Sequence, residues 1–329
     1  MNARRRVVVD TDAGVDDACA LLYLAGRPDA EVVAVTSVAG NCAEDDVVRN
    51  IGYVARLAGL PAPVARGAGE PLPGAPRVPR GAHGEDGLGG LGLDRPMPAV
   101  TGESAAGLLV RLARERPGEL DLLALGPLTN LALALRSDPA LFTKYRSVVV
   151  MGGSGPWDIP AERLARDTNI ARDPSAARAV LSAPRRLMLM VGVDVTSAAL
   201  LPEPRIAALS AAGGPAARFA ALILRAHLAS HPGRGGVPLH DPLAAGILLD
   251  PGLATAAALG PVNVVRDGPL WRGRLMRARD GRPPPFPWAP APDTRVVTAA
   301  DAARFVRGFL AALTGGVPRD AGALPPAEK

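Results

Sequence analysis

The chain is poor in aromatic residues, cysteine and lysine. Phenylalanine, tryptophan and tyrosine together make up 3% of its 329 residues, so leucine, valine and alanine must supply most of the core. Cys19 and Cys42 are too few for a disulfide framework, and we expect free, buried thiols. A chain of this length buries enough apolar surface to fold without such cross-links.

Long apolar runs are also absent. No stretch reaches the roughly 18 to 20 apolar residues of a membrane-spanning helix, so we expect no contact with a membrane. Residues 1–9 pass from three arginines into a short apolar run, without the longer apolar region and cleavage site of a signal peptide. We therefore expect a cytoplasmic protein.

The net charge of +5 and the pI near 9.8 raise the question of nucleic-acid binding. The arginines are spread along the chain, and beyond Arg4, Arg5 and Arg6 they form no cluster interleaved with aromatic residues. Such a pattern lacks the basic stripe of a nucleic-acid surface. We expect no nucleic-acid partner.

Continuous apolar runs alternate with segments of helical periodicity. The runs predict strands buried on both faces, at residues 7–9, 32–38, 120–125, 148–151 and 187–195. The helical spacing is clearest at residues 16–25, 43–60, 105–116, 128–136 and 174–181. This alternation predicts an α/β fold: an open, Rossmann-like and mostly parallel central sheet with helices on both faces.

The second half of the chain predicts longer elements. We expect helices at 204–231, 241–249 and 300–313, a hairpin at 262–279 and a proline-rich loop at 282–292. No linker divides the sequence, so we expect a single domain over residues 1–313 and a disordered tail at 314–329. The long glycine- and proline-rich stretch 67–98 is typical of a functional or a disordered loop.

Polar residues follow five of the predicted strands. These positions are Asp10 to Asp12, Ala39 to Asn41, Gly126 to Asn130, Gly152 with Gly153, and Asp194. In open parallel sheets the carboxyl ends of the strands form the ligand crevice. The sequence therefore predicts a site at this edge.

Four carboxylates, Asp10, Asp12, Asp16 and Asp17, lie within eight residues. Unpaired, they would repel one another and raise one another's pKa values. A hard cation with oxygen ligands, Ca²⁺ or Mg²⁺, removes that conflict. Capping of the following helix is the alternative for Asp16 or Asp17, but it does not explain Asp10 and Asp12.

His240 and Asp241 open a predicted helix late in the chain. Asp241 could be a fifth carboxylate at the metal, with His240 beside it as a proton donor. A simple helix cap is the alternative.

Several blocks together resemble the inosine-uridine-type nucleoside hydrolases, a family of calcium-dependent N-glycoside hydrolases. The most specific is residues 8–18 (VVDTDAGVDDA). The others, in the family's order, are 37–41 (SVAGN), 63–67 (PVARG), 83–89 (HGEDGLG), 125–130 (LGPLTN), 151–153 (MGG) and 240–244 (HDPLA).

The resemblance implies a calcium ion that binds two sugar hydroxyls and the attacking water. Its ligands would be Asp12, Asp17, the carbonyl of Leu125 and Asp241, and Asp12 would also take the water's proton. The sugar contacts would come from Asp16, Asn41 and Asn169, with Asp10 orienting the ligands from behind. Hydrolysis would pass through an oxocarbenium-like transition state, stabilised by nearby oxygens such as that of Asn41.

The resemblance also implies how the base is held and released. His240 would protonate the departing base, and His83 on the long loop would help to close the pocket. His227 and His231 lie where the family often has aromatic residues over the base, although exposed histidines are the alternative. Trp157 could stack on a base or simply pack.

The sequence departs from the family where the 5′ end of the ribose is gripped. The family's Glu-Phe-Asn triplet is Asp167, Thr168 and Asn169 here, and no asparagine lies between Ser154 and Thr168. Ordinary ribonucleosides would then be poor substrates, and 5′-modified or otherwise atypical ribosides better ones.

Two other functions compete with a nucleoside N-ribohydrolase of purine or pyrimidine catabolism. A phosphatase of the haloacid-dehalogenase type also begins with Asp-x-Asp, but it needs a lysine, and Lys144 and Lys329 are not near an acidic strand end. A metal-binding nucleoside- or sugar-binding protein with weak or no hydrolase activity would explain the altered 5′ grip. By the resemblance we expect a homodimer or homotetramer.

Overall fold

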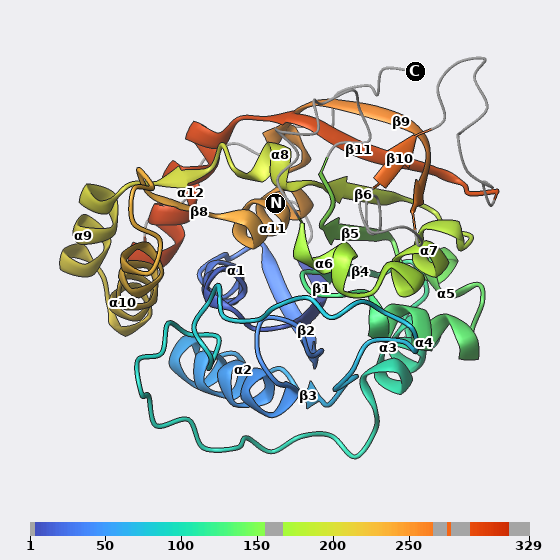
Figure 1. Cartoon of the computed structure of the whole chain (residues 1–329), viewed down its shortest axis with the longest axis horizontal. Helices are drawn as coiled ribbons and strands as arrows, with labels where there is room; N and C mark the ends of the chain where they lie inside the picture. Colours follow the sequence, from blue (N-terminus) through green and yellow to red (C-terminus); the bar gives the residue numbers. More distant parts are fainter. Residues whose placement is uncertain (1–3, 155–166, 266–274, 278–289, 316–329) are drawn as a thin grey trace.

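The computed structural model describes residues 4–154, 167–265, 275–277 and 290–315. Within them, nine strands form one sheet in the order β10-β9-β11-β6-β5-β4-β1-β2-β3 (Figure 1). The strands of the sheet are β1 (Arg5–Thr11), β2 (Ala30–Ser37), β3 (Val64–Ala65), β4 (Leu120–Ala124), β5 (Ser147–Met151), β6 (Met188–Val191), β9 (Ala254–Val264), β10 (Leu275–Arg277) and β11 (Asp293–Ala300). A separate antiparallel pair joins β7 (Leu200–Leu201) to β8 (Val237–Pro238).

The sheet is mostly parallel, as the alternating periodicities predict. Strand β1 pairs in parallel with β2 and β4, and parallel pairing continues through β5 and β6 to β11. Only β9 breaks the pattern among the described strands, because it runs antiparallel to both β11 and β10. The predicted hairpin is therefore confirmed, with its first strand longer than expected.

Helices cover both faces of the sheet. They are α1 (Val15–Ala25), α2 (Glu44–Ala58), α3 (Ala105–Glu115), α4 (Thr129–Ser137), α5 (Leu141–Lys144), α6 (Thr168–Arg172), α7 (Pro174–Ser182), α8 (Val193–Thr196), α9 (Glu203–Ala212), α10 (Pro215–Ala229), α11 (His240–Leu249) and α12 (Ala302–Thr314), with a short 3₁₀ turn at Pro251–Leu253. Among the described residues, no helix is both long and apolar enough to cross a membrane.

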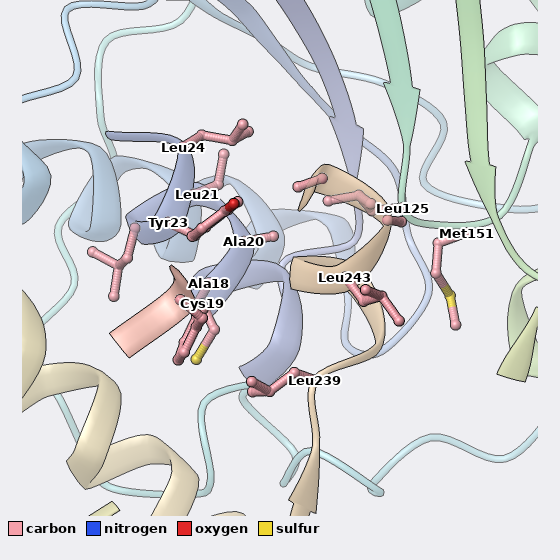
Figure 2. Packing of buried hydrophobic residues seen from close by; sticks show 14 of the residues in the cluster. Ala18, Cys19, Ala20, Leu21, Tyr23, Leu24, Leu125, Met151, Leu239 and Leu243 are labelled. Carbon is pink, nitrogen blue, oxygen red and sulfur yellow. The ribbon is translucent and has the colours of Figure 1, made fainter. Parts of the chain in front are cut away.

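Two hydrophobic cores lie on opposite faces of the sheet, because side chains alternate along each strand. In β1, Val7 and Val9 pack with α1, α2 and α9 to α12, whereas Val8 packs with α3, α4, α5 and α7 (Figure 1). On the first face, Leu243 of α11 lies between the side chains of α1 and those of Leu125 and Met151 (Figure 2). That packing brings the start of α11 to the carboxyl ends of the strands.

Two predicted elements are wrong in detail, and one strand was missed. The single helix expected at 204–231 is two helices, since Gly213, Gly214 and the N–H-less Pro215 interrupt it. The strand expected at 187–195 stops at Val191, and a short helix follows in which Asp194 is exposed rather than at a site. Strand β11 was not predicted, and it occupies residues just after the proline-rich stretch.

The long segment after β3 contains no helix or strand up to α3, yet it is tied to the body. The Ala68 N–H donates to Asn130 Oδ1 at 2.8 Å, and the Leu72 N–H to Asp173 Oδ2 at 2.8 Å. Its end returns to the sheet edge, where the N–H groups of Thr101 and Ala105 donate to the carbonyls of Val64 and Arg66 at 2.8 and 2.7 Å.

Candidate active site

The predicted polar residues meet at the carboxyl edge of the sheet. Asp12 lies in the turn between β1 and α1, and Asp16 and Asp17 lie in the first turn of α1. The segment after β2 carries Asn41, and the start of α11 brings His240 and Asp241. The capping alternative fails for His240 and Asp241, because the N-cap residue of α11 is Leu239 and no side chain caps it. For Asp17 the capping interpretation is confirmed, since Oδ2 accepts a hydrogen bond from the backbone N–H of Gly14, the N-cap residue, at 2.9 Å.

The carboxylates form a buried cluster. Asp16, Asp17 and Asp241 each offer an oxygen within 4.8 Å of the others, and Asp12 is buried beside them. Burial raises the pKa values of all four, and those of Asp12 and Asp241 rise well above the usual range. The neighbouring carboxylates raise the pKa values of Asp12, Asp17 and Asp241 further.

Hydrogen bonds fix the orientation of Asp12 and Asp17. Asn41 donates its backbone N–H to Asp12 Oδ2 at 2.8 Å, and its Nδ2 to Asp12 Oδ1 at 3.1 Å and Asp17 Oδ2 at 3.3 Å. The Thr11 hydroxyl donates to Asp17 Oδ1 at 2.5 Å. A Cβ on Gly40 would lie 2.0 Å from Asp12 Oδ2, so only glycine lets the β2 loop approach this closely.

Asp10 lies fully buried behind the cluster. Its Oδ1 accepts hydrogen bonds from Thr36 Oγ1 at 2.5 Å and Asn130 Nδ2 at 2.7 Å. Burial raises its pKa to about 7, despite these bonds. Its contacts connect β1 to β2 and α4, so it secures the strands on which the cluster stands.

Two carboxylate oxygens in this region have no hydrogen-bond partner among the described residues. They are Asp10 Oδ2 and Asp16 Oδ1, both fully shielded from solvent. Buried, unpaired carboxylate oxygens next to further carboxylates are the donor set that hard cations require. The cluster therefore fits a metal ion.

A cavity of about 200 Å³ lies over the cluster. Asp16, Asn41, Leu125 and Asp241 are among its lining residues. The chain contains four histidines in total, and all of them line this cavity: His83, His227, His231 and His240. Such concentration at one cavity is unlike a scatter of surface histidines, and it indicates a function.

Three of the histidines form a continuous wall. The ring centroids of His83 and His227 are 5.1 Å apart, and His227 stacks on His231 at 4.3 Å. His83 Nδ1 accepts a hydrogen bond from the Val15 N–H at 3.1 Å. Burial lowers the pKa of His83 to about 4 and that of His227 to about 3, so both rings are neutral at pH 7.

His240 is oriented by a residue that the sequence did not indicate. Its Nδ1 lies 2.7 Å from Thr196 Oγ1, which itself donates to the Gly192 carbonyl at 3.1 Å. Because the threonine proton goes to that carbonyl, His240 donates through Nδ1 and keeps Nε2 for the cavity. Burial lowers the pKa of His240, and the nearby Asp16 charge opposes the shift.

The comparisons with known proteins agree with this geometry. The family model described as inosine-uridine preferring nucleoside hydrolase matches residues 7–307. The chain belongs to this family. That finding displaces the phosphatase alternative and confirms the resemblance in the sequence.

Individual nucleoside hydrolases align over most of the chain. Uridine nucleosidase 1 of Arabidopsis thaliana is 34% identical, covering 78% of this chain and 77% of its own. The pyrimidine-specific ribonucleoside hydrolase RihA of Salmonella schwarzengrund is 36% identical, covering 76% and 81%. Among solved structures, the plant nucleoside hydrolase PpNRh1 has a TM-score of 0.85 at 27% identity, and the match covers 94% of this chain and 99% of that one. The purine-preferring ribonucleoside hydrolase of Gardnerella vaginalis has a TM-score of 0.82 at 26% identity, and the match covers 94% of this chain and 98% of that one.

In this nucleoside hydrolase, the structure describes Asp167 and Asn169 among the residues expected at the sugar's 5′ end. Asp167 lines the cavity, but it also caps α6, accepting hydrogen bonds from the N–H groups of Asn169 at 3.2 Å and Ile170 at 2.7 Å. Asn169 Nδ2 donates to the carbonyls of Leu125 at 2.6 Å and Met151 at 3.2 Å. Trp157 lies outside the described residues.

Sequence reasoning assigned two histidines with an open alternative and missed two arginines. His227 is 7% exposed, which rules out the alternative of an exposed residue, and His231 is half-buried.

The two missed arginines are Arg172 and Arg234, and Arg234 also lines the cavity. Arg172, 9% exposed, donates to the carbonyls of Val78 and Pro79 at 3.1 and 3.0 Å and places a positive charge near Asp12. No spacing rule relates these arginines to the acidic turn, so only the fold could reveal them.

Proposed function

We propose that this nucleoside hydrolase cleaves the N-glycosidic bond of ribonucleosides or related N-ribosides, with Ca²⁺ as its cofactor. The observation that carries the proposal is the meeting of the buried carboxylate cluster and all four histidines at one cavity. Carboxylates suit the sugar and water side of the reaction, and imidazoles suit the departing base.

The ion would be held by Asp12, Asp17, Asp241 and the Leu125 carbonyl, with Asp10 supporting the strands behind. When bound, calcium would orient the sugar hydroxyls and make the attacking water more acidic. Asp16 Oδ1 has no hydrogen-bond partner in the described part of the chain and lies 3.7 Å from His83 Nδ1, and Asp16 would accept a hydrogen bond from a sugar hydroxyl in the cavity that it lines. Asn41 and Asn169 would contribute the other sugar contacts.

The chemical steps assigned to the protein are two proton transfers. Asp12 would accept a proton from water as the water oxygen attacks C1′ and the bond to the base breaks. His240 would first take up a proton at Nε2 from solvent, while its Nδ1 proton stays on the Thr196 side, and would then donate the Nε2 proton to the base nitrogen, so that the base leaves uncharged and the ring returns to its neutral form. His83, His227 and His231 would line the base, and the neutral rings of His83 and His227 could donate or accept hydrogen bonds. We assign Trp157 and Asp167 to the remaining substrate contacts.

The test is a panel of nucleosides with base release measured by chromatography, in the presence of calcium. Uridine comes first, because the curated relatives are named for uridine and pyrimidine ribonucleosides, and inosine and guanosine represent the purines. Base release that Asp12→Asn abolishes would support the proposal. Nucleoside binding by calorimetry without any base release would favour the binding-protein alternative, which the altered 5′ region motivates.

We also propose that residues 1–313 form one domain that assembles into a homodimer or homotetramer. Light scattering on the full chain would give the mass of the particle, and limited proteolysis would show where the compact unit ends.

A further inference from the structure

Asn50 lies on α2 and is fully buried. Its Nδ2 donates to the carbonyl oxygen of Ala13 at 3.0 Å and to that of Asp86 at 2.9 Å. Its Oδ1 accepts a hydrogen bond from Arg95 Nη1. A single side chain thus joins two segments that are far apart in the sequence.

The first of these segments is the acidic turn. Ala13 has φ +44°, and it is the one non-glycine residue with positive φ in the described part of the chain. That conformation is unfavourable for a residue with a Cβ and persists where surroundings enforce it. Here the Ala13 N–H donates to Thr11 Oγ1 at 3.1 Å, and the Ala13 carbonyl is held by Asn50. The bend places Asp12 and Asp17, on either side, in one cluster.

The second segment carries His83. Gly87 has φ +80°, and a Cβ there would lie 2.9 Å from Asn50 Nδ2 and 2.8 Å from Cys42 Sγ. The backbone of this segment therefore packs directly against Asn50. Leu88 is fully buried, and the Gly89 N–H donates to the His83 carbonyl at 2.8 Å. Together these contacts hold His83 over the acidic turn.

We propose that Asn50 is a positioning residue that locks the acidic turn to the His83 segment, and so sets both the calcium affinity and the rate of the enzyme. Asn50 is fully buried and outside the residues lining the cavity, so it acts through Ala13 and Asp86 rather than by touching substrate. The inference rests on the proposed function, because it assumes that the turn holds calcium. Residues that support metal ligands from behind typically affect metal affinity or activity about 10- to 100-fold.

The test variant is Asn50→Leu, which is similar in size and lacks the donors and the acceptor. Calcium alone is titrated into the chelator-treated full-length protein by calorimetry, and kcat and KM are measured at saturating calcium. We expect calcium affinity to fall about 10- to 100-fold, with a fall in kcat that excess calcium does not restore, because His83 is misplaced as well. Asn50→Ser, which keeps one hydroxyl donor, should lie between wild type and Asn50→Leu, and it replaces Asn50→Leu if that variant does not fold.

Tyr145→Phe is the matched control. Tyr145 is also fully buried and donates one hydrogen bond to a backbone carbonyl, that of Leu109 at 2.9 Å, on the other face of the sheet. It should lower the melting temperature without changing calcium affinity or kcat. If both Asn50 variants behave like Tyr145→Phe, the inference is overturned while the proposed function stands. A wild-type protein that binds no calcium would overturn both.

Discussion

Asp16 and Asp241 line the floor of the cavity, with Asp12 and Asp17 buried beside them, whereas one wall is formed by the rings of His83, His227 and His231. Burial disfavours charge in both regions, and it shifts pKa values in opposite directions. It raises the pKa values of the carboxyl groups and lowers those of His83 and His227. The buried carboxylates of the floor therefore favour a cation beside them, while the rings of His83 and His227 remain neutral without one.

In the proposed reaction, this difference would separate two parts of the chemistry. A charged floor with calcium would suit the sugar, where positive charge develops and hydroxyls must be held. A neutral wall suits a heterocyclic base, which offers hydrogen-bond donors, acceptors and an aromatic face. His240 lies where the two regions meet, since it lines the cavity and precedes Asp241 in α11.

The largest expected effect comes from removing the cation from the floor. Exhaustive chelation should abolish base release and lower the melting temperature, because the carboxylates then repel one another. Added calcium should restore both, since a ligand that binds only the folded state stabilises it. Full activity in protein shown by elemental analysis to be metal-free would contradict the assigned role of the floor.

The next effect is expected at His240, where floor and wall meet. His240→Ala should slow the release of natural bases by about 10² to 10⁴, the usual range for a lost general acid. A nitrophenyl riboside needs no proton on its leaving group and should lose little. Thr196→Val should show the same pattern with a smaller loss, because Thr196 only orients the ring. Equal losses on both substrates would mean that His240 positions the substrate instead.

A smaller effect is expected at the 5′ end of the sugar. The Asp167 oxygens accept hydrogen bonds from backbone N–H groups of α6, so the carboxylate is partly occupied, and it is one methylene shorter than the family's glutamate. One hydrogen bond to a charged group is worth roughly 1.5 to 3 kcal/mol. Removing the 5′-hydroxyl should therefore lower kcat/KM by a factor about ten or more times smaller than in an enzyme that makes all of these hydrogen bonds.

The measurement is kcat/KM for matched ribosides with and without the 5′-hydroxyl. If removing that hydroxyl costs several kcal/mol of transition-state binding, another residue has replaced the grip, and the expectation of altered specificity is wrong.

The smallest effect concerns the pH dependence of the wall. His83 and His227 have folded-state pKa values of about 4 and about 3, below the ordinary 6.5. The unfolded chain therefore binds more protons below pH 6.5, and stability is lost as the pH falls toward those values. The raised carboxyl pKa values act in the opposite sense, since their burial destabilises the protein as the pH rises above 3.8.

Replacing one histidine isolates the contribution of the wall. As the pH falls from 6.5 to 5, the free energy of unfolding of His227→Phe should decrease less steeply than that of wild type, by about 1 kcal/mol per pH unit. Urea unfolding of the chelator-treated proteins at several pH values measures the difference. Parallel pH profiles for the two proteins would show that His227 is not buried as a neutral ring.

Much of the fold was predictable because local signals agree with it. The strands β1, β2, β4 and β5 are buried on both faces, and strands buried in this way have continuous apolar runs in their sequence. The errors have physical causes. Gly192 ends β6 where the apolar run continues, and β11 contains the polar residues Asp293, Thr294 and Arg295, so no continuous run marks it.

The parts of the site formed by residues close together in the sequence could be predicted, whereas contacts between residues far apart in the sequence could not. The spacing of Asp12 to Asp17 predicted a cation, the start of a late helix made Asp241 a weaker candidate for the same ion, and the resemblance implied the ligand set. The contact between Thr196 and His240, by contrast, joins residues 44 apart, and the tilted ring contact of His83 with His227 joins segments with no common pattern. Asn50 is a similar case, because nothing in its sequence neighbourhood distinguishes it from other polar residues of a helix.

The covered edge at β3 restricts how copies of this enzyme could associate. A bare edge strand invites another chain to continue the sheet, which leads to aggregation or strand-mediated dimers. Here the edge strand has two residues, and the carbonyls of Val64 and Arg66 on either end already accept N–H groups from Thr101 and Ala105. Continuous intermolecular β-pairing at this edge would require the returning segment to detach first. Subunits that assemble at this edge would therefore have to recognise one another through side chains on loops and helices, where complementary shape restricts association to specific partners.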